Sequence, residues 1–354
     1  MQTFLKKLIL FLAIPIIILF IVENYLPATL FTFRAWEALA VRKSKYFTGQ
    51  FYPNTSCSMI EEGDLAPHTP LAVKKKVFWK IDEIGFRNDQ YIPEPDVLII
   101  GDSNTVGSGM SQEETLTARL KQLTNLKVYN IAPAGINQYT ELRNDALFLS
   151  PKTVVFSCIE RSILGLAPCE ADAKIKYHFI QHNPIAKFIM PWIDRLYKAK
   201  SLHYLAARAQ PLTHKGILST HNKRFLYLQG HGAQIQPSEK NYQCAVKLIT
   251  SYKTYFNSIG CRFIFLPIPN KETIYWEWLD LKEQPKFFQN LTALLKENGI
   301  ETVDTLKLFN VLKEDGTMPY HMDDSHWNQA GVQSAAKALA SMLNQAPDIT
   351  LPAN

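Results

Sequence analysis

The sequence predicts a doubly wound α/β domain, in which helices cover both faces of a parallel sheet. Short apolar runs typical of buried strands occur at 97–100, 127–131, 153–158, 262–266 and 301–303. Amphipathic helices are expected between them, at about 112–123, 137–149, 239–257, 285–297 and 328–343. Such alternation indicates parallel strands buried on both faces. In sheets of this kind, ligands collect at the carboxyl ends of the strands.

An apolar segment precedes this domain. Lys6 and Lys7 are followed by fifteen residues, Leu8–Val22, without a charge. Phe4–Leu26 reaches the roughly 20 residues that span a bilayer. Either a signal peptide or a retained anchor fits, and the lack of a small-x-small cleavage site close to Val22 favours an uncleaved anchor over residues 1–33. The lysines favour a cytoplasmic N-terminus, and hence an inner-membrane protein with a periplasmic domain. Basic residues on the far side weaken this orientation argument: Arg34, Arg42, Lys43 and Lys45.

Three further segments are expected after the anchor. Residues 34–95 are turn-rich and predict an irregular lead-in, and residues 96–345 carry the α/β rhythm. Residues 162–238 interrupt that rhythm with mixed composition and six of the nine histidines. We expect a mostly helical insertion over the strand ends, serving as a lid or substrate-binding region.

Composition narrows the partners. The 354 residues carry a net charge of +6 that is spread along the chain, without a basic run interleaved with aromatics, so no nucleic acid partner is expected. His178 and His182 stand four apart but lack a third ligand, so no metal or cofactor is expected. Five cysteines leave at least one unpaired. The candidate pairs in an oxidising compartment are Cys169 with Cys244, or Cys57 with either, and the sequence does not decide between pairing and free thiols.

Two short motifs carry the chemistry. Gly101-Asp102-Ser103-Asn104 follows the first strand, and Asp323-Asp324-Ser325-His326-Trp327-Asn328 precedes the last helix. A serine needs a histidine to take its proton and a carboxylate to orient that histidine. Ser103 is the candidate nucleophile and His326 the candidate base, with Asp324 or Asp323 as the acid. A helix cap at Ser103 and a surface histidine at 326 would explain each motif singly, but not both.

These motifs resemble the SGNH (GDSL) hydrolase superfamily, whose sheet is flavodoxin-like. Gly85-Phe86-Arg87 and the serine motif are similar to the opening of many bacterial members, and Asp-x-His-Trp-Asn with Gly331 fits their closing block. The resemblance favours Asp324 over Asp323. It implies an oxyanion hole formed by the backbone N–H groups of Ser103 and Gly135. The asparagine of the third family block is missing after Val154-Val155-Phe156, which leaves Arg161 or Asn137 as the third donor.

Other residues are similar to the alginate-type O-acetylation branch of that superfamily. Glu160-Arg161 and the later Lys271 and Tyr275 resemble its pattern, although in that branch Asp-x-His precedes the serine block. The resemblance implies that Arg161, Lys271 and Tyr275, together with Trp327 beside the base, contact the substrate. The alternative for Glu160-Arg161 is a structural ion pair.

The expected function is a membrane-anchored extracytoplasmic enzyme with an acyl-Ser103 intermediate. It would transfer or remove an O-acyl group, most simply acetyl, on a cell-surface polysaccharide, with a membrane protein as acyl donor. One alternative is a lipid or small-ester hydrolase. Another is a non-catalytic polysaccharide-binding scaffold of an export complex.

Overall fold

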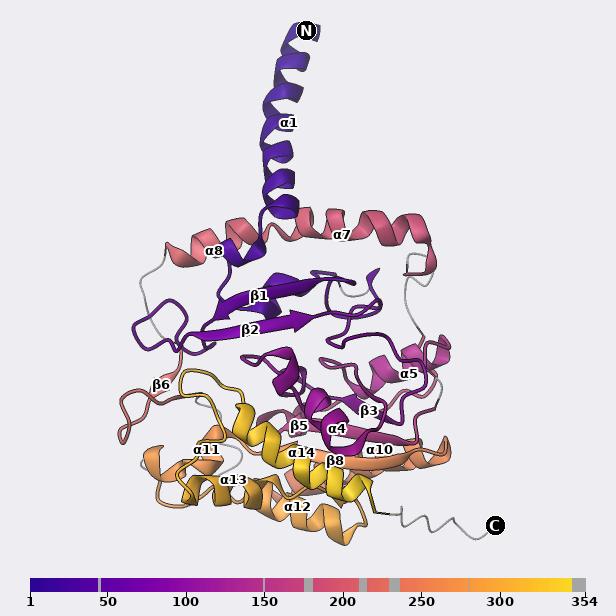
Figure 1. Ribbon diagram of the computed structural model, residues 1–354, viewed down its shortest axis with the longest axis vertical. Coiled ribbons are helices and arrows are strands. Elements are labelled where there is room, and N and C mark those ends of the chain that lie inside the picture. The colour runs from indigo at the N-terminus through magenta and orange to yellow at the C-terminus, as the bar shows by residue number, and fades with distance from the viewer. Residues whose placement is uncertain are drawn as a thin grey trace.

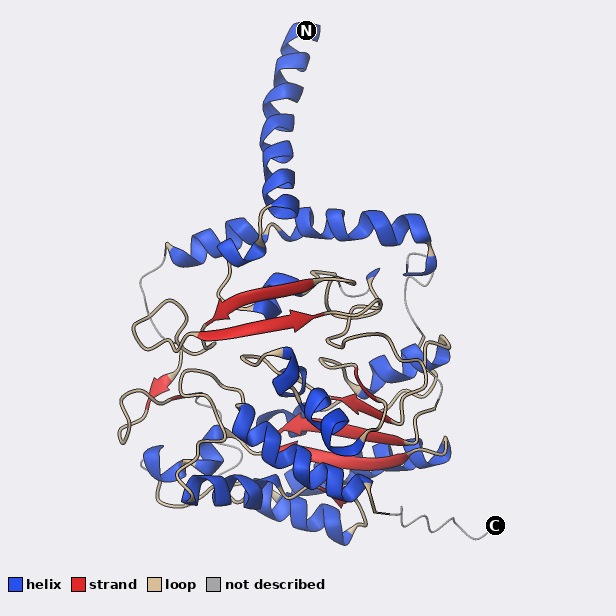
Figure 2. Ribbon diagram, viewed as in Figure 1, coloured by secondary structure: helices blue, strands red, loops and turns tan. Residues whose placement is uncertain are grey.

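A five-stranded parallel sheet forms the centre of the protein. The computed structural model describes residues 1–43, 46–148, 150–174, 181–209, 215–228, 236–279 and 281–345. The strand order is β4-β3-β5-β8-β9, and each neighbouring pair is parallel. The strands are β3 (Val97–Ile100), β4 (Val128–Asn130), β5 (Thr153–Ile159), β8 (Arg262–Ile268) and β9 (Glu301–Thr302). The predicted doubly wound fold is confirmed (Figure 2).

Helices cover both faces of this sheet. Side chains alternate along β3, so that Leu98 and Ile100 enter one buried cluster while Val97 and Ile99 enter the other. The first cluster is completed by α5 (Ile136–Asn144), α10 (Glu239–Ser258) and α12 (Phe287–Glu297). The second is completed by α4 (Leu116–Thr124), α13 (Thr305–Glu314) and α14 (Gln329–Leu343). Figure 1 shows α13 and α14 on the outside of the sheet.

Short helical turns join these elements. They are α3 (Ser103–Val106), η3 (Gln112–Glu114), η4 (Glu160–Gly165), α11 (Lys271–Ile274) and η5 (Trp276–Leu279). The helix expected from about residue 112 is divided, because Thr115 adopts an extended conformation and caps α4 by accepting a hydrogen bond from the Ala118 N–H. The sequence did not reveal α13.

The lead-in over residues 34–95 is more ordered than expected. It contains α2 (Ala35–Leu39) after the turn η1 (Ala28–Leu30), and an antiparallel hairpin of β1 (Ser56–Glu61) and β2 (Lys75–Lys80). The hairpin buries Val77 and Trp79 in a cluster that includes Val106 of α3 and Ala132, which follows β4. Its strands lack a continuous apolar run because only one face is buried, so their strand signal in the sequence is weak.

Helix α1 (Gln2–Tyr25) extends away from the rest of the protein. Among the described residues it is the one helix long and apolar enough to cross a membrane, and none of its apolar window is buried. Two helices, α7 (Pro184–Lys198) and α8 (Lys200–Arg208), lie crosswise at its base (Figure 1). Trp192 of α7 stacks on Phe20 of α1 with ring centroids 5.9 Å apart.

The expectation that the insertion covers the strand ends is wrong for α7 and α8. They pack against α1 and the lead-in, where Asp194 of α7 accepts hydrogen bonds from the Arg42 and Lys43 N–H groups. Within the described residues of the insertion, the small hairpin of β6 (Ile217–Leu218) and β7 (Leu226–Tyr227) reaches the histidine loop, through a hydrogen bond of 2.9 Å from Leu226 N to Met322 O.

Candidate active site

Ser103 stands on the turn between β3 and α3. Its neighbour Asp102 caps α3: Oδ1 accepts from Asn104 N at 2.9 Å, and Oδ2 accepts from Ile159 N at 2.8 Å. Asp102 therefore ties the serine turn to the carboxyl end of β5. A Cβ at Gly101 would come within 2.3 Å of Thr105 Oγ1, so the turn needs glycine there. Ser103 itself is partly exposed, as a nucleophile must be.

His326 and Asp324 meet this serine in a hydrogen-bonded chain. His326 Nε2 lies 2.8 Å from Ser103 Oγ, and His326 Nδ1 lies 2.5 Å from Asp324 Oδ1. Burial by itself would lower the pKa of His326, but the charge and hydrogen bond of Asp324 raise it above its usual value. Burial opposes the charge on Asp324, yet His326 keeps the pKa of this carboxyl well below its usual range. The arrangement suits transfer of the Ser103 proton to Nε2.

Asp323, the other candidate acid, faces a different partner set. Its Oδ2 accepts from the N–H groups of Gly63 at 2.8 Å and Val73 at 2.7 Å, and its Oδ1 lies 3.1 Å from Lys75 Nζ. Asp323 thus ties the histidine loop to the segment between β1 and β2. A Cβ at Gly63 would lie only 2.1 Å from Asp323 O. The geometry therefore favours Asp324 as the partner of His326, with Asp323 as a structural residue.

Asp64 is a member of the site that sequence reasoning missed. Its carboxylate accepts from Ser325 N and Ser325 Oγ, both at 2.8 Å, and its Oδ2 lies 3.9 Å from His326 Nδ1. Burial, and then the charge of Asp324, raise the pKa of Asp64. Ligand atoms of Asp64, Asp324 and His326 lie within 4.8 Å of one another. Because they already bond to Ser325, to the Asp64 N–H and to each other, we assign this cluster to orientation of His326.

Trp327 joins the two motifs. Its backbone N–H donates to Asn104 Oδ1 at 3.2 Å, and its Nε1 donates to Asn104 O at 2.9 Å. The side chain is 0% exposed, so the expectation that it contacts the substrate is corrected to a positioning role. It fixes the residue after the nucleophile to the residue after the base.

Lys271 and Tyr275 are also buried, contrary to the expectation that they bind substrate. Lys271 is 2% exposed, and its ammonium donates to four carbonyl oxygens: those of Leu226 and His321 at 2.6 Å, Asp324 at 3.0 Å and Met322 at 3.1 Å. Burial lowers the pKa of Lys271 to about 7. Tyr275 packs on Phe225 with ring centroids 4.8 Å apart. These residues shape the histidine loop from within.

Arg87, the last residue of the Gly85-Phe86-Arg87 motif, has a structural role. Its guanidinium donates to the carbonyls of Val106 at 3.0 Å, Gly107 at 2.6 Å and Met110 at 2.8 Å, which follow the serine turn. It also lies 3.7 Å from the centroid of the Trp79 ring on β2. Arg87 therefore holds the end of α3 against the hairpin.

The expected oxyanion donors differ in their placement. Gly135 is the exposed N-cap of α5, and the Ala134 N–H beside it donates to Gly101 O at 2.9 Å, which brings this loop next to the serine turn. A Cβ at Gly135 would meet nothing within 4 Å, so the position faces open space. Asn137 Oδ1 accepts from Glu170 N at 2.9 Å.

Arg161 is the other candidate for the third donor. It follows β5, whose last residue, Ile159, donates its N–H to Asp102 of the serine turn. The Arg161 backbone N–H donates to Asn270 Oδ1 at 3.2 Å, which ties this position to the turn after β8. The Glu160 carboxylate does not form the alternative ion pair with Arg161. Glu160 accepts from Asn270 N at 2.8 Å and Thr273 Oγ1 at 2.6 Å.

Two remaining expectations concern residues outside the active site. All five cysteines carry free thiols, so none of the three candidate pairs among Cys57, Cys169 and Cys244 is formed. His182 Nε2 lies 2.7 Å from Asp145 Oδ2, whereas His178 lies outside the described residues.

The site and fold define a class: a doubly wound α/β protein with a serine–histidine–aspartate chain at the strand ends. Residues 222–353 match the family model of the SGNH hydrolase-like domain of the acetyltransferase AlgX. This segment contains Asp324 and His326 but not Ser103. This part of the chain is thus similar to the SGNH hydrolase-like domain of AlgX, in line with the resemblance that the sequence predicted.

Solved structures that are similar come from three bacteria. A predicted acylhydrolase of Bacteroides fragilis has 15% identity and a TM-score of 0.36, covering 71% of this chain and 86% of that one. A lipolytic G-D-S-L family protein of Veillonella parvula has 11% identity and a TM-score of 0.36, covering 72% and 99%. A GDSL-like lipase of Bacteroides thetaiotaomicron has 13% identity and a TM-score of 0.32, covering 71% and 87%. At these TM-scores the fold assignment rests on the strand order instead. No curated protein matches the chain.

Proposed function

We propose that this protein is a serine acyltransferase or esterase that works through an acyl-Ser103 intermediate. The observation that carries the proposal is the hydrogen-bonded chain from Ser103 Oγ through His326 to Asp324, with distances of 2.8 and 2.5 Å. The SGNH hydrolase-like match over residues 222–353 supports acyl-transfer or ester-hydrolysis chemistry. The buried contacts of Trp327, Lys271 and Asp323 all serve to hold the hydrogen-bonded Ser103, His326 and Asp324 in place.

In the first half-reaction, His326 Nε2 takes the Ser103 proton as Oγ attacks the carbonyl carbon of the acyl donor. The negative charge then forms on the carbonyl oxygen, where the N–H groups of Ser103 and Gly135 can stabilise it, with Arg161 as the third donor. Collapse of this intermediate breaks the bond to the donor oxygen, which leaves with the proton held by His326. The product is an ester of Ser103.

In the second half-reaction, a hydroxyl of the acceptor loses its proton to His326 and attacks the same carbonyl carbon. The bond to Ser103 Oγ breaks, and His326 returns the proton to Oγ. A sugar hydroxyl as acceptor gives a transferase, and water gives an esterase. We favour acetyl transfer to a cell-surface polysaccharide, because the family model is that of an acetyltransferase.

The location we propose is the outer side of the inner membrane, with α1 as the anchor and a membrane protein as acyl donor. The support is the length and exposed apolar surface of α1. Because α7 and α8 meet α1 at its base, the catalytic domain would begin directly at the bilayer surface (Figure 1).

The test uses the full-length protein in detergent with an acetylated sugar as donor. We expect acetate release that is lost in Ser103→Ala and kept in Ser251→Ala, a serine exposed on α10. A fluorophosphonate should label Ser103. Absence of both turnover and labelling would refute the enzyme proposal and leave a binding scaffold. Adding oligosaccharide acceptors separates the two reactions, because only a transferase forms acetylated oligosaccharide at the expense of free acetate.

A further inference from the structure

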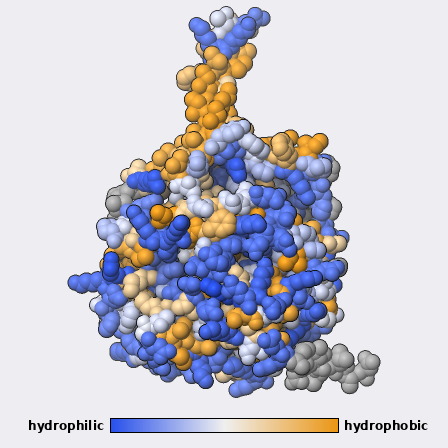
Figure 3. Space-filling model, in the orientation of Figure 1, coloured by the Kyte–Doolittle hydropathy of each residue, from blue (hydrophilic) through white to orange (hydrophobic). Residues whose placement is uncertain are grey.

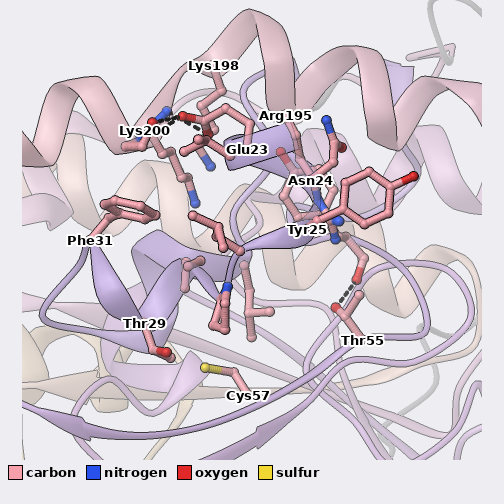
Figure 4. Close-up of a pocket in the computed structure, with 18 of the residues that line it drawn as sticks. Glu23, Asn24, Tyr25, Thr29, Phe31, Thr55, Cys57, Arg195, Lys198 and Lys200 are labelled. Carbon is pink, nitrogen blue, oxygen red and sulfur yellow. Dashed lines mark hydrogen bonds between the residues drawn. The ribbon is translucent and has the colours of Figure 1, made fainter. Parts of the chain in front are cut away.

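A pocket of about 420 Å³ lies at the base of α1, and neither Ser103 nor His326 lines it. Its walls come from the last turn of α1, from α7 and α8, and from β1 (Figure 4). The lining residues that the argument uses are Glu23, Arg195, Lys198 and Lys200. Its volume falls in the range of ligand-binding pockets. The proposed acyl-transfer reaction has no use for it.

Two lysines of this pocket are placed where an anion would bind. Lys200 is 8% exposed, and Lys198 on the preceding helix is half-buried. Neither Nζ has a hydrogen-bond acceptor among the described residues. Burial lowers the pKa of Lys198 to about 8, and burial together with the neighbouring Lys198 lowers that of Lys200 far below its usual value. Buried ammonium groups without an acceptor are costly, and an anion between them would remove that cost.

The nearby carboxylates are occupied elsewhere. Glu23, at the end of α1, accepts from the backbone N–H groups of Lys200 and Ser201 at 3.1 and 2.9 Å, and so caps α8. Asp194 accepts from Arg42 N, Lys43 N and Tyr52 Oη. Glu37 accepts from Arg34 and Thr32. These three acids moderate the local charge, but none accepts a hydrogen bond from either lysine Nζ.

The surroundings of the pocket indicate where its ligand comes from. On α7 and α8, large apolar side chains are exposed on both sides of the base of α1: Ile185, Phe188, Ile189, Ile193, Leu202 and Leu205. Figure 3 shows apolar atoms continuing from α1 onto this upper rim of the protein. Trp192 and Tyr25 pack together at the same level, as aromatic side chains do at membrane interfaces. A helix of this kind, apolar on one face and basic on the other, lies in the interface plane.

From these observations we infer that the pocket between α1, α7 and α8 binds the phosphate of an anionic phospholipid through Lys198 and Lys200. The acyl chains would lie along α1 and the exposed apolar side chains of α7 and α8. The inference rests on α1 spanning the bilayer, as proposed above, and it is independent of chemistry at Ser103.

The experiment measures lipid retention by native mass spectrometry on the full-length protein in detergent. The probes are dioleoyl phosphatidylglycerol, dioleoyl phosphatidylcholine and inorganic phosphate. We expect one phosphatidylglycerol to be retained about tenfold more tightly than phosphatidylcholine, and Lys198→Gln/Lys200→Gln to remove that preference. Lys187→Gln/Lys240→Gln is the control, because it removes the same charge from exposed positions outside the pocket. Ser103→Ala must retain the lipid as the native chain does.

Thermal melting shows whether the double variant folds. Phosphatidylglycerol should raise the melting temperature of the native protein but not that of the variant. If the double variant does not fold, Lys198→Gln alone, at the half-buried position, must weaken retention. Equal retention of the two lipids, unchanged retention in the lysine variants, or complete displacement by millimolar phosphate would each overturn the lipid site. Release of the protein from membranes by alkaline carbonate would overturn the anchor on which the inference rests.

Discussion

Replacing Asp64 with asparagine tests the electrostatics of the proposed site. Asp64 Oδ2 lies 3.9 Å from His326 Nδ1. Burial opposes the charge on His326, but Asp324 and then Asp64 raise its pKa. A general base works in its neutral form, so activity should fall as the pH decreases through this pKa. Removing the Asp64 charge should lower the pKa of His326 and move the acid limb of the pH–rate profile to lower pH.

The size of the effect follows from the distance. Two unit charges 3.9 Å apart interact by about 1 kcal/mol in bulk water and ~4 kcal/mol at an effective dielectric constant of 20. The Asp64 side chain is 21% exposed, so the lower value is the appropriate one. A loss of about 1 kcal/mol should shift the acid limb by roughly 0.7 pH unit. It should also reduce the plateau of kcat/KM about fivefold, because the imidazolium formed during proton transfer loses the same stabilisation.

The assay is acetate release from an acetylated sugar across the pH range, with kcat/KM fitted at each pH. The amide oxygen of the substituted side chain can still accept from Ser325 N, and its NH₂ group can donate to Ser325 Oγ in place of the bond that Oγ now donates. The loop should therefore keep its shape, which thermal melting would verify. Asp315→Asn is the control, since it removes one negative charge from an exposed turn. An acid limb that stays in place or moves to higher pH in Asp64→Asn would refute the electrostatic reasoning.

Four other substitutions distinguish residues that take part in the chemistry from residues that support the fold. Asp324→Asn should lower kcat about 10⁴-fold without unfolding the protein. Asp323→Asn should chiefly lower the free energy of unfolding, by about 1–3 kcal/mol. Comparable losses of kcat in both variants would contradict the assignment of Asp324 as the acid and Asp323 as a structural residue. Lys271→Met leaves four carbonyls without their donor and should cost about 3 kcal/mol of stability in urea unfolding, and an unchanged midpoint would remove its structural role. Gly63→Ala places a Cβ 2.1 Å from Asp323 O and should lower both the melting temperature and activity, while Gly165→Ala, with open space around it, should change neither.

The sheet could be predicted from the sequence because buried parallel strands are continuous apolar runs. β5 and β8 are buried along nearly their whole length, and their boundaries differ from the prediction by two residues or fewer. The β1–β2 hairpin was missed because it buries one face only, and half of each strand is polar or charged. Periodicity over six residues with an intervening loop is a weak signal.

The site residues likewise divide into those that a sequence motif reveals and those that only the folded structure reveals. Ser103, Asp324 and His326 stand in motifs whose residue types and order constrain their arrangement, and the structure places them together. Asp64 has no such motif, and only tertiary packing places it beside Ser325. Trp327 and Lys271 were assigned to substrate because residue type does not reveal exposure. A tryptophan or lysine near a site can equally well fix a loop from inside, as both do.

The segment between α1 and the hairpin links the proposed anchor directly to this site. It is tied down within ten residues of the end of α1: Ala35 N donates to Glu61 Oε1 at 2.5 Å, and Glu62 N donates to Phe33 O at 3.1 Å. Arg34 Nη1 lies 3.9 Å from Asp64 Oδ2, so the charge network around His326 begins in this same segment. A flexible linker would let the domain sample many heights and orientations above a bilayer. This connection, with Glu23 also capping α8, holds the domain in one orientation to α1. A membrane-embedded acyl donor, as proposed above, would therefore meet Ser103 at a fixed height.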